Sequence, residues 1–254
     1  MAQFSKNLIS LLLVLLVGGI GGMLADRMVL PYLAQTVYFG KISWIKQSEN
    51  QKTVINKTER ITITEDVAIE ESVARIKASV VGVLTKRIIG KIEQVLTEGT
   101  GFILTADGLI VTSNNLLPVL KSPEQVKYYI VIDQRLIAAQ LLKKDTVNNL
   151  AILKIQESNL SVVYLADADQ VRLGQRVILI GAEDYNGLLS SVVNISIIRS
   201  ILNGDFILNL KNESGFLSGG PLINVRGEVI GLSLVDAQGN LKVISVDKIK
   251  DLLK

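Results

Sequence analysis

Short runs of β-branched and aliphatic residues follow one another along most of the chain, from Val80 to Ser245. Turn signals such as Ala106-Asp107-Gly108 and Asn203-Gly204-Asp205 separate these runs. More than ten strands of this length and spacing predict an all-β sandwich or barrel. Within the series, Ile92–Leu96 and Gly101–Leu104 are expected as two separate strands.

Two short helices are expected at the ends of this β-rich region. In "DVAIEESVARIKASVVGV", Ile69, Val73 and Ile76 recur at spacings of four and three, which is typical of a helix with one apolar face. The last residues, "DKIKDLLK", predict a short amphipathic helix.

The stretch Leu8–Ala25, "LISLLLVLLVGGIGGMLA", is 18 residues without a charge. This length falls within the range of about 17–25 residues for a membrane-spanning helix. A cleaved signal peptide usually has a shorter apolar run of about 7–15 residues and a small-x-small cleavage site. The exit sequence Met23-Leu24-Ala25 fits that site poorly. Residues 8–25 therefore predict a transmembrane signal anchor.

The charges around this run predict its orientation and the domain boundaries. Lys6 precedes the run, whereas Asp26 and Arg27 cancel after it. The positive-inside rule then places residues 1–7 in the cytoplasm and the rest of the chain on the periplasmic or extracellular side of a single-pass membrane protein. Residues 26–65 are interpreted as a juxtamembrane stalk with a short strand at Ile61–Thr64, and residues 66–254 as the globular domain.

Composition excludes several classes of function. The chain has 0 cysteines and 0 histidines, so it has no cysteine nucleophile, no disulfide and none of the usual zinc ligands. The spacing of acidic residues shows no EF-hand pattern, and no metal or cofactor is expected. Net charge is +3 without a compact Lys/Arg block, which argues against a nucleic-acid partner.

A serine stands in the stretch "GFLSGGPLIN", residues 215–224, between a turn and an apolar run. A serine hydroxyl is a weak nucleophile until a neighbouring base removes its proton, and histidine is the usual base. Because the chain has 0 histidines, Ser218 either uses another base or has no catalytic role.

Three stretches, in this order, resemble the Deg/HtrA family of trypsin-like serine proteases. They are "GTGFILTADGLIVTSNNLL" at residues 99–117, "DTVNNLAILKI" at residues 145–155, and "GFLSGGPLINVRGEVIGLSL" at residues 215–234. The resemblance covers about residues 70–254. It implies a chymotrypsin-like double β-barrel, preceded here by the short helix and the transmembrane helix, with the site in the cleft between the barrels.

The resemblance also implies which positions form the site. The family's histidine falls on Asn115 and its aspartate on Asn149, whereas Ser218 keeps the position of the nucleophile. The oxyanion hole falls on the backbone of Phe216 and Ser218, and the family has glycine where Phe216 stands. If that turn needs a positive φ, phenylalanine reshapes it.

Three functions remain open from the sequence. The first is an inactive protease homologue that binds a peptide or protein partner through the former substrate cleft, with Ser218 hydrogen-bonded to backbone. The second is an active serine endopeptidase in which a lysine replaces histidine as the base. The third is a structural scaffold of the cell envelope. The candidate lysines for the second function are Lys211, nearest in sequence, and Lys143, Lys144 and Lys154, which flank the second motif.

The uncharged run predicts the topology of the chain. We expect the protein to stay in the membrane after carbonate extraction, and alkaline phosphatase fused after Lys254 to be active in a bacterial host. An inactive fusion would contradict the exported orientation. Soluble release with a new N-terminus near Asp26 would identify a cleaved signal peptide instead.

Overall fold

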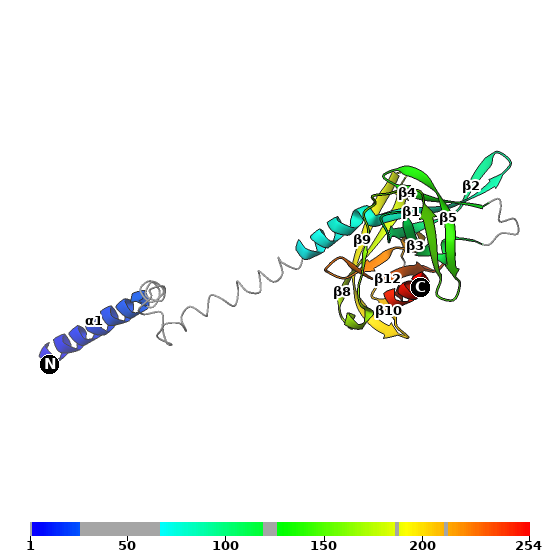
Figure 1. Cartoon of the computed structure of the whole chain (residues 1–254). Coiled ribbons are helices and arrows are strands. Elements are labelled where there is room, and N and C mark those ends of the chain that lie inside the picture. The colour runs from blue at the N-terminus through cyan, green and yellow to red at the C-terminus, as the bar shows by residue number, and fades with distance from the viewer. Residues whose placement is uncertain (1, 26–66, 119–125, 186–187, 211–212) are drawn as a thin grey trace. The chain divides into compact units, whose positions relative to one another are not determined.

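The computed structural model of the chain describes residues 2–25, 67–118, 126–185, 188–210 and 213–254 (Figure 1). The chain forms two compact units, Met1–Thr64 and Glu65–Lys254. The predicted stalk over residues 26–65, with its strand at Ile61–Thr64, lies outside the described residues.

The first unit contributes helix α1, Ala2–Leu24, which includes most of the apolar run predicted as an anchor. In the part of the chain that the structure describes, no helix is both long enough and apolar enough to cross a membrane. The anchor over residues 8–25 stays a prediction from the sequence.

The first half of the second unit is a closed barrel of antiparallel strands in the order β1-β2-β3-β6-β5-β4. Its strands are β1 Val80–Ile89, β2 Ile92–Ile103, β3 Leu109–Ser113, β4 Val126–Ile132, β5 Arg135–Asp145 and β6 Leu150–Ile155. The prediction of two strands within residues 92–104 was wrong, because β2 is continuous. A bulge between Thr85 and Lys86 shifts the register, and the polar residues of β2 continue to pair with β1 across it.

The second half forms a sheet in the order β11-β8-β9-β10-β13-β12-β7, and pairing of β11 with β12 closes it into a second barrel. Its strands are β7 Tyr164–Leu165, β8 Arg176–Tyr185, β9 Leu188–Leu202, β10 Asp205–Leu208, β11 Pro221–Ile223, β12 Glu228–Val235 and β13 Leu241–Ser245. The short β7 adds to β12 in parallel. The all-β double barrel expected from the sequence is therefore confirmed.

Buried apolar side chains form three clusters, one inside each barrel and one between the barrels. The cluster between the barrels joins Phe102, Val111 and Leu150 of the first to Ile178 and Leu232 of the second. At about 25 cal/mol per Å² of apolar surface removed from water, this interface stabilises one barrel against the other.

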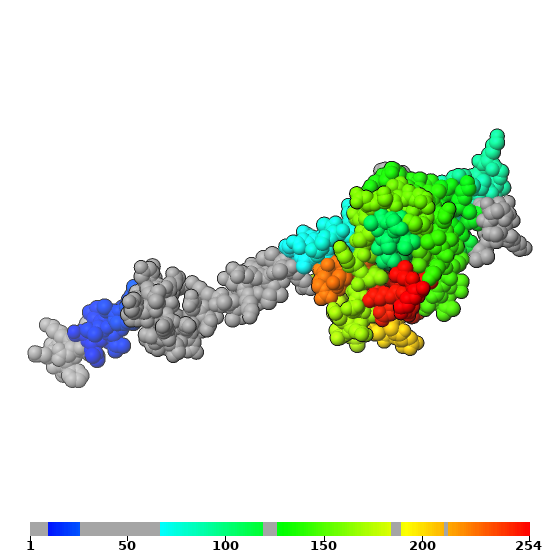
Figure 2. Space-filling model, viewed as in Figure 1, coloured from blue at the N-terminus to red at the C-terminus, as the bar shows by residue number. Residues whose placement is uncertain are grey.

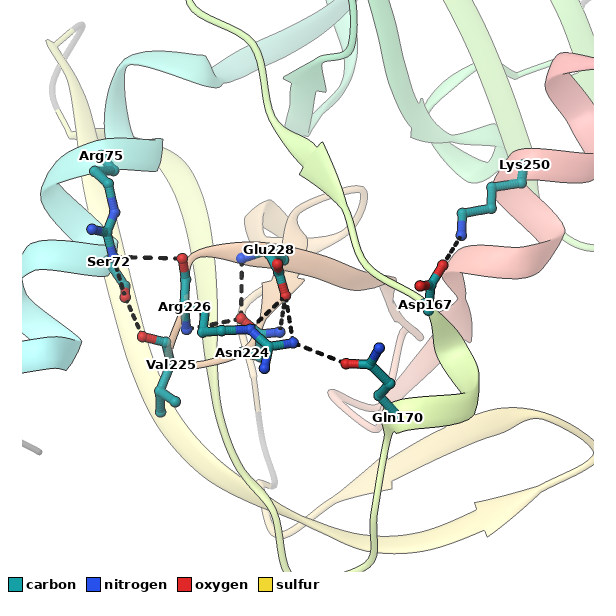
Figure 3. A network of polar contacts seen from close by, with 9 residues as sticks. All are labelled: Ser72, Arg75, Asp167, Gln170, Asn224, Val225, Arg226, Glu228 and Lys250. Carbon is teal, nitrogen blue, oxygen red and sulfur yellow. Dashed lines mark hydrogen bonds and ion pairs between the residues drawn. The ribbon is translucent and has the colours of Figure 1, made fainter.

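The predicted one-sided helix is confirmed over residues 67–76. Ile69 and Ile76 are buried in the cluster between the barrels, and Val73 packs against it. Ser72 lies on the same helix, and its hydroxyl donates to the carbonyl of Val225 at 2.6 Å (Figure 3). The helix is thus fixed to the turn between β11 and β12.

That turn is held by its own polar contacts (Figure 3). Arg226 forms an ion pair with Glu228 at 2.8 Å and donates to the side-chain oxygen of Gln170 at 3.1 Å. The Asn224 amide donates to Glu228 at 2.7 Å. Hydrogen bonds from Asn224 and then from Arg226 lower the pKa of Glu228. The turn positions β11, which directly follows Ser218-Gly219-Gly220.

The last helix, α4 Val246–Leu253, confirms the prediction from "DKIKDLLK". Ser245 caps it by accepting from the Asp247 amide at 3.3 Å. The buried carboxylate of Asp205 fixes α4 to β13 by ion pairs with Lys248 at 2.6 Å and Lys242 at 2.9 Å. Burial raises the pKa of Asp205, but the hydrogen bonds from Lys248 and Lys242 outweigh it, so the pKa lies below 3.8.

We predict that Asp205→Asn lowers the free energy of unfolding at about pH 7 by about 1–3 kcal/mol, because it removes the charge from two hydrogen-bonded lysine pairs. A carboxyl with a lowered pKa stabilises the fold above its unfolded pKa, and this contribution is lost as the pH falls through the folded pKa. The difference between the two proteins should therefore shrink below pH 3.8. Denaturant unfolding across this pH range measures it.

Asp167→Asn is the matched control for this substitution. Asp167 pairs with Lys250 at 3.2 Å, but its side chain is 73% exposed. An exposed ion pair contributes about 0–1 kcal/mol, so this change should have little effect. Equal losses of unfolding free energy in the two variants would contradict the stabilising role assigned to the buried carboxylate of Asp205.

Candidate functional site

Backbone contacts bring the three motif segments together between the barrels. The Asn114 amide donates to the carbonyl of Asn149 at 2.9 Å, which joins the first segment to the second. A Cβ on Gly219 would lie 2.9 Å from the Ser113 amide nitrogen, so the third segment lies against the first. The structure thus gathers the neighbourhoods of Asn115, Asn149 and Ser218 at one place.

Asn115, at the position of the family's histidine, lies in a 3-10 turn over Asn114–Leu116. Its side chain is exposed, and its backbone amide donates to the Ser113 hydroxyl at 3.2 Å, which caps the turn. The neighbouring Asn114 side chain has a buried oxygen without a hydrogen bond in the described residues. A carboxamide has no basic nitrogen near neutral pH, so neither residue can remove a proton from serine.

Asn149, at the position of the family's aspartate, is half-buried and has a φ of 57°. It ends a turn that Asp145 organises. The Asp145 carboxylate accepts from the amides of Val147 at 2.9 Å and Asn148 at 3.0 Å. Hydrogen bonds from Asn148 lower the pKa of Asp145. The carboxylate next to this segment therefore stabilises the turn, and the amide of Asn149 supplies no charge to orient a base.

Ser218 follows a 3-10 turn over Gly215–Leu217, and its side chain is 3% exposed. Its hydroxyl oxygen makes no hydrogen bond to any described residue. The expectation that Ser218 hydrogen-bonds to backbone was therefore wrong. Ser233 makes such contacts instead, because its hydroxyl donates to the carbonyls of Leu217 and of Gly220, the latter at 3.0 Å.

Residues 214–220, called the site loop below, use every backbone amide from Phe216 to Gly220 within the protein. The Phe216 amide donates to the Ser214 hydroxyl at 3.4 Å, and the Leu217 amide to the Ser214 carbonyl at 3.0 Å. The Ser218 amide donates to Gly215 at 3.0 Å. The Gly219 amide donates to the carbonyl of Ser233 at 2.7 Å, and the Gly220 amide to that of Leu217 at 3.1 Å. No amide of this stretch points free toward a substrate oxygen.

Leu217 explains why the site loop closes in this way. Its side chain is 2% exposed and belongs to the core of the second barrel. It lies so close to Gly181 that a Cβ there would approach its Cδ2 to 2.3 Å. Phe216 keeps a negative φ, whereas Gly219 takes the positive φ of 88°. The site loop thus contains a 3-10 turn that is fixed by Leu217 and capped by Ser214, two residues that the sequence reasoning did not single out. The reshaping expected from Phe216 stays a prediction.

Three of the four lysines considered as replacement bases have other partners. Lys143 donates to the carbonyl of Leu252 at 2.9 Å, and Lys144 to that of Leu117 at 2.8 Å. Lys154 forms an ion pair with Asp107 at 3.3 Å. Lys211 lies outside the described residues. In the described ranges, moreover, no three Asp or Glu side chains come close enough to hold a metal ion.

A cavity of about 170 Å³ lies beside the site loop and is lined by both barrels. Much of its wall is apolar, from Leu84, Val131 and Leu136 of the first barrel and Leu189 of the second. The half-buried Phe216 lines it from the site loop. The arrangement can hold an apolar group against Phe216, whereas Ser218 does not line the cavity.

A family model for the trypsin-like peptidase domain matches residues 99–232, more than half of the chain. The chain belongs to the trypsin-like peptidase family. It is 31% identical over 170 residues to the mitochondrial serine protease HTRA2 of Drosophila ananassae, covering 62% of this chain and 39% of that protein. It is 27% identical over 145 residues to a probable periplasmic serine endoprotease, DegP-like, of Hahella chejuensis, covering 56% and 30%. The Deg/HtrA resemblance is confirmed, and the chain spans less than half the length of these relatives.

The environments of Ser218 and Ser233 predict opposite effects of the same substitution. Both side chains are buried, but only that of Ser233 is hydrogen-bonded. Ser218→Ala removes an unpaired hydroxyl and should raise the free energy of unfolding by about 1 kcal/mol. Ser233→Ala removes bonds that hold the site loop and should lower it by about 1–3 kcal/mol.

Chemical denaturation of the two variants beside the native chain measures both changes. A loss of about 1 kcal/mol or more in Ser218→Ala would show that its hydroxyl is bonded in solution.

Proposed function

We propose that this chain is a catalytically inactive homologue of the trypsin-like proteases that binds a peptide or protein partner in the cleft between its barrels. One observation carries the proposal: all five backbone amides from Phe216 to Gly220 donate to acceptors within the protein. None of these five amides is therefore free to donate to the negative charge of a tetrahedral intermediate.

Three requirements of acyl transfer are missing together. A serine nucleophile needs a base, the base needs an orienting group, and the developing oxyanion needs free donors. The first two positions carry Asn115 and Asn149, and the chain has 0 histidines. Loss of one oxyanion donor alone lowers kcat by about 10²–10³-fold. The buried hydroxyl of Ser218 adds a steric barrier to any acyl group.

The cavity beside Phe216 supports the binding of a partner. Its volume of about 170 Å³ is below the range of about 300–1,000 Å³ of pockets that hold a drug-sized ligand. It suits one apolar side chain of a longer partner. Walls from both barrels make such a contact specific to the folded domain.

Membrane attachment and export are part of this proposal and rest on the sequence. The uncharged run over residues 8–25 supports the anchor, and Lys6 supports the orientation. The Hahella chejuensis relative is named as periplasmic, which is in accord with an exported domain.

Repair of the site tests the proposed inactivity. We predict that the native chain is not labelled at Ser218 by a fluorophosphonate probe and does not hydrolyse peptide or thioester substrates. The double variant Asn115→His/Asn149→Asp should remain nearly silent, because the site loop still lacks free donors. Adding Phe216→Gly to the double variant should produce measurable hydrolysis, whereas Phe216→Gly alone should not, because catalytic groups act as a unit.

The native chain and the three variants are compared in one assay, with circular dichroism to confirm that each is folded. Labelling of native Ser218, or native hydrolysis equal to that of the triple variant, would refute the proposal and revive a serine endopeptidase with another base. A triple variant that folds and stays silent would show that Asn115 and Asn149 do not occupy the assigned positions.

A further inference from the structure

The β1–β2 hairpin projects from the first barrel (Figures 1 and 2). Strand β4 pairs with β1 as far as Arg87, opposite Val126. Beyond that point β1 and β2 continue to pair with each other up to Ile89 and Ile92. Residues 88–95, called the hairpin tip below, therefore extend as two strands past the end of the described β4.

The hairpin tip carries large aliphatic side chains in solvent. Ile89 and Ile92 lie directly opposite each other across the turn, and they are 48% and 70% exposed. Val95 is 44% exposed. Gly90, with a φ of 63°, permits the tight turn that brings the two isoleucines onto one face. An exposed aliphatic cluster on a projection has a binding role more often than scattered surface residues do.

The hairpin carries three cations, Lys86, Arg87 and Lys91, and two carboxylates, Glu93 and Glu98. Lys91 lies in the turn between the isoleucines, and Arg87 lies on the same face of the strand as Ile89. Glu93 is the acidic residue of the tip, and it pairs with Lys86 at 3.1 Å. Lys127 on β4 lies opposite Lys86 in the register. Aliphatic side chains thus lie at the end of the projection with Lys91 between them. Arg87 follows on the same strand face, and Glu93 is paired with Lys86.

We propose that the hairpin tip inserts into the headgroup region of an anionic lipid surface. Ile89 and Ile92 enter the boundary of the acyl chains, while Lys91 and the cations behind it stay at the level of the phosphates. Apolar area and attraction to anionic lipids are the two contributions that hold amphipathic elements at such an interface. The exposed isoleucines on a projecting tip, with Lys91 between them, favour a lipid surface over a protein pocket. The proposal depends neither on the site loop nor on residues 8–25.

A site-specific fluorophore tests this contact in the full chain. Because the chain has 0 cysteines, Gln94→Cys gives a single labelling position on the face of Ile92, and both isoleucines are kept. An environment-sensitive label there should shift to shorter wavelength with vesicles containing about one third phosphatidylglycerol, and much less with phosphatidylcholine alone. The apolar run over residues 8–25 would insert into vesicles of either composition. Only the difference in wavelength shift between the anionic and the neutral vesicles therefore reports on the hairpin tip.

Matched controls separate the tip from general attachment. Gln238→Cys places the same label in the exposed turn between β12 and β13 and should give no shift. In the Gln94→Cys background, Ile89→Ser/Ile92→Ser should weaken vesicle binding by the tip at least about tenfold, since two aliphatic side chains are no longer buried. Ile195→Ser/Ile197→Ser, at isoleucines of β9 that are 51% and 43% exposed, should leave it unchanged.

A further variant measures how much the charge of Lys91 contributes to vesicle binding. Lys91→Gln should weaken binding to the anionic vesicles about fivefold, as expected for one cation at such a surface. No shift at Gln94→Cys with anionic vesicles, or an equal shift at Gln238→Cys, would overturn the proposal. A shift that appears without vesicles and grows with protein concentration would overturn it in favour of contact between copies of the chain.

Discussion

Thr100 holds the site loop against both barrels, and it is fully buried where they meet. Its amide donates to the carbonyl of Ser218 at 2.9 Å, and its hydroxyl donates to the carbonyl of Phe216 at 2.6 Å. The same hydroxyl accepts from the Ala182 amide of the second barrel at 2.8 Å. Its carbonyl accepts from Thr112 of the first at 2.7 Å. Because a buried polar group without partners is destabilising, these four bonds fix the loop, the barrels and the position of Ser218 together.

The fold could be predicted from sequence because its determinants are local. The alternation of β-branched residues and turns indicated the strands, and the spacing of Ile69, Val73 and Ile76 indicated the helix at residues 67–76. The continuity of β2 was not predicted, because polar residues separate its two apolar runs in the sequence. Pairing with β1, across a bulge, carries the strand through them. That pairing partner lies outside any local window.

The candidate site was predictable only in its residue identities. The order of the motifs indicated positions 115, 149 and 218, and the structure gathers their segments. The direction of the amides was not predictable, since it depends on Leu217 entering the second barrel and on Ser214 capping the turn. The lack of a hydrogen bond to the Ser218 hydroxyl was not predictable either, because tertiary packing decides which groups lie near it. A leucine directly before the serine was the one signal that could have suggested the closed loop.

The burial of Leu217 has an evolutionary consequence. A leucine in a barrel core contributes about 2–5 kcal/mol against truncation to alanine, so selection for a stable barrel preserves this residue whatever the domain does. The closed shape of the loop is then maintained as a by-product of folding. A descendant that acquired histidine and aspartate at positions 115 and 149 would still inherit the closed shape. Because the core fixes Leu217, a change that opens the loop would have to begin at a position outside the core, such as the half-buried Phe216, where a substitution leaves the barrel intact.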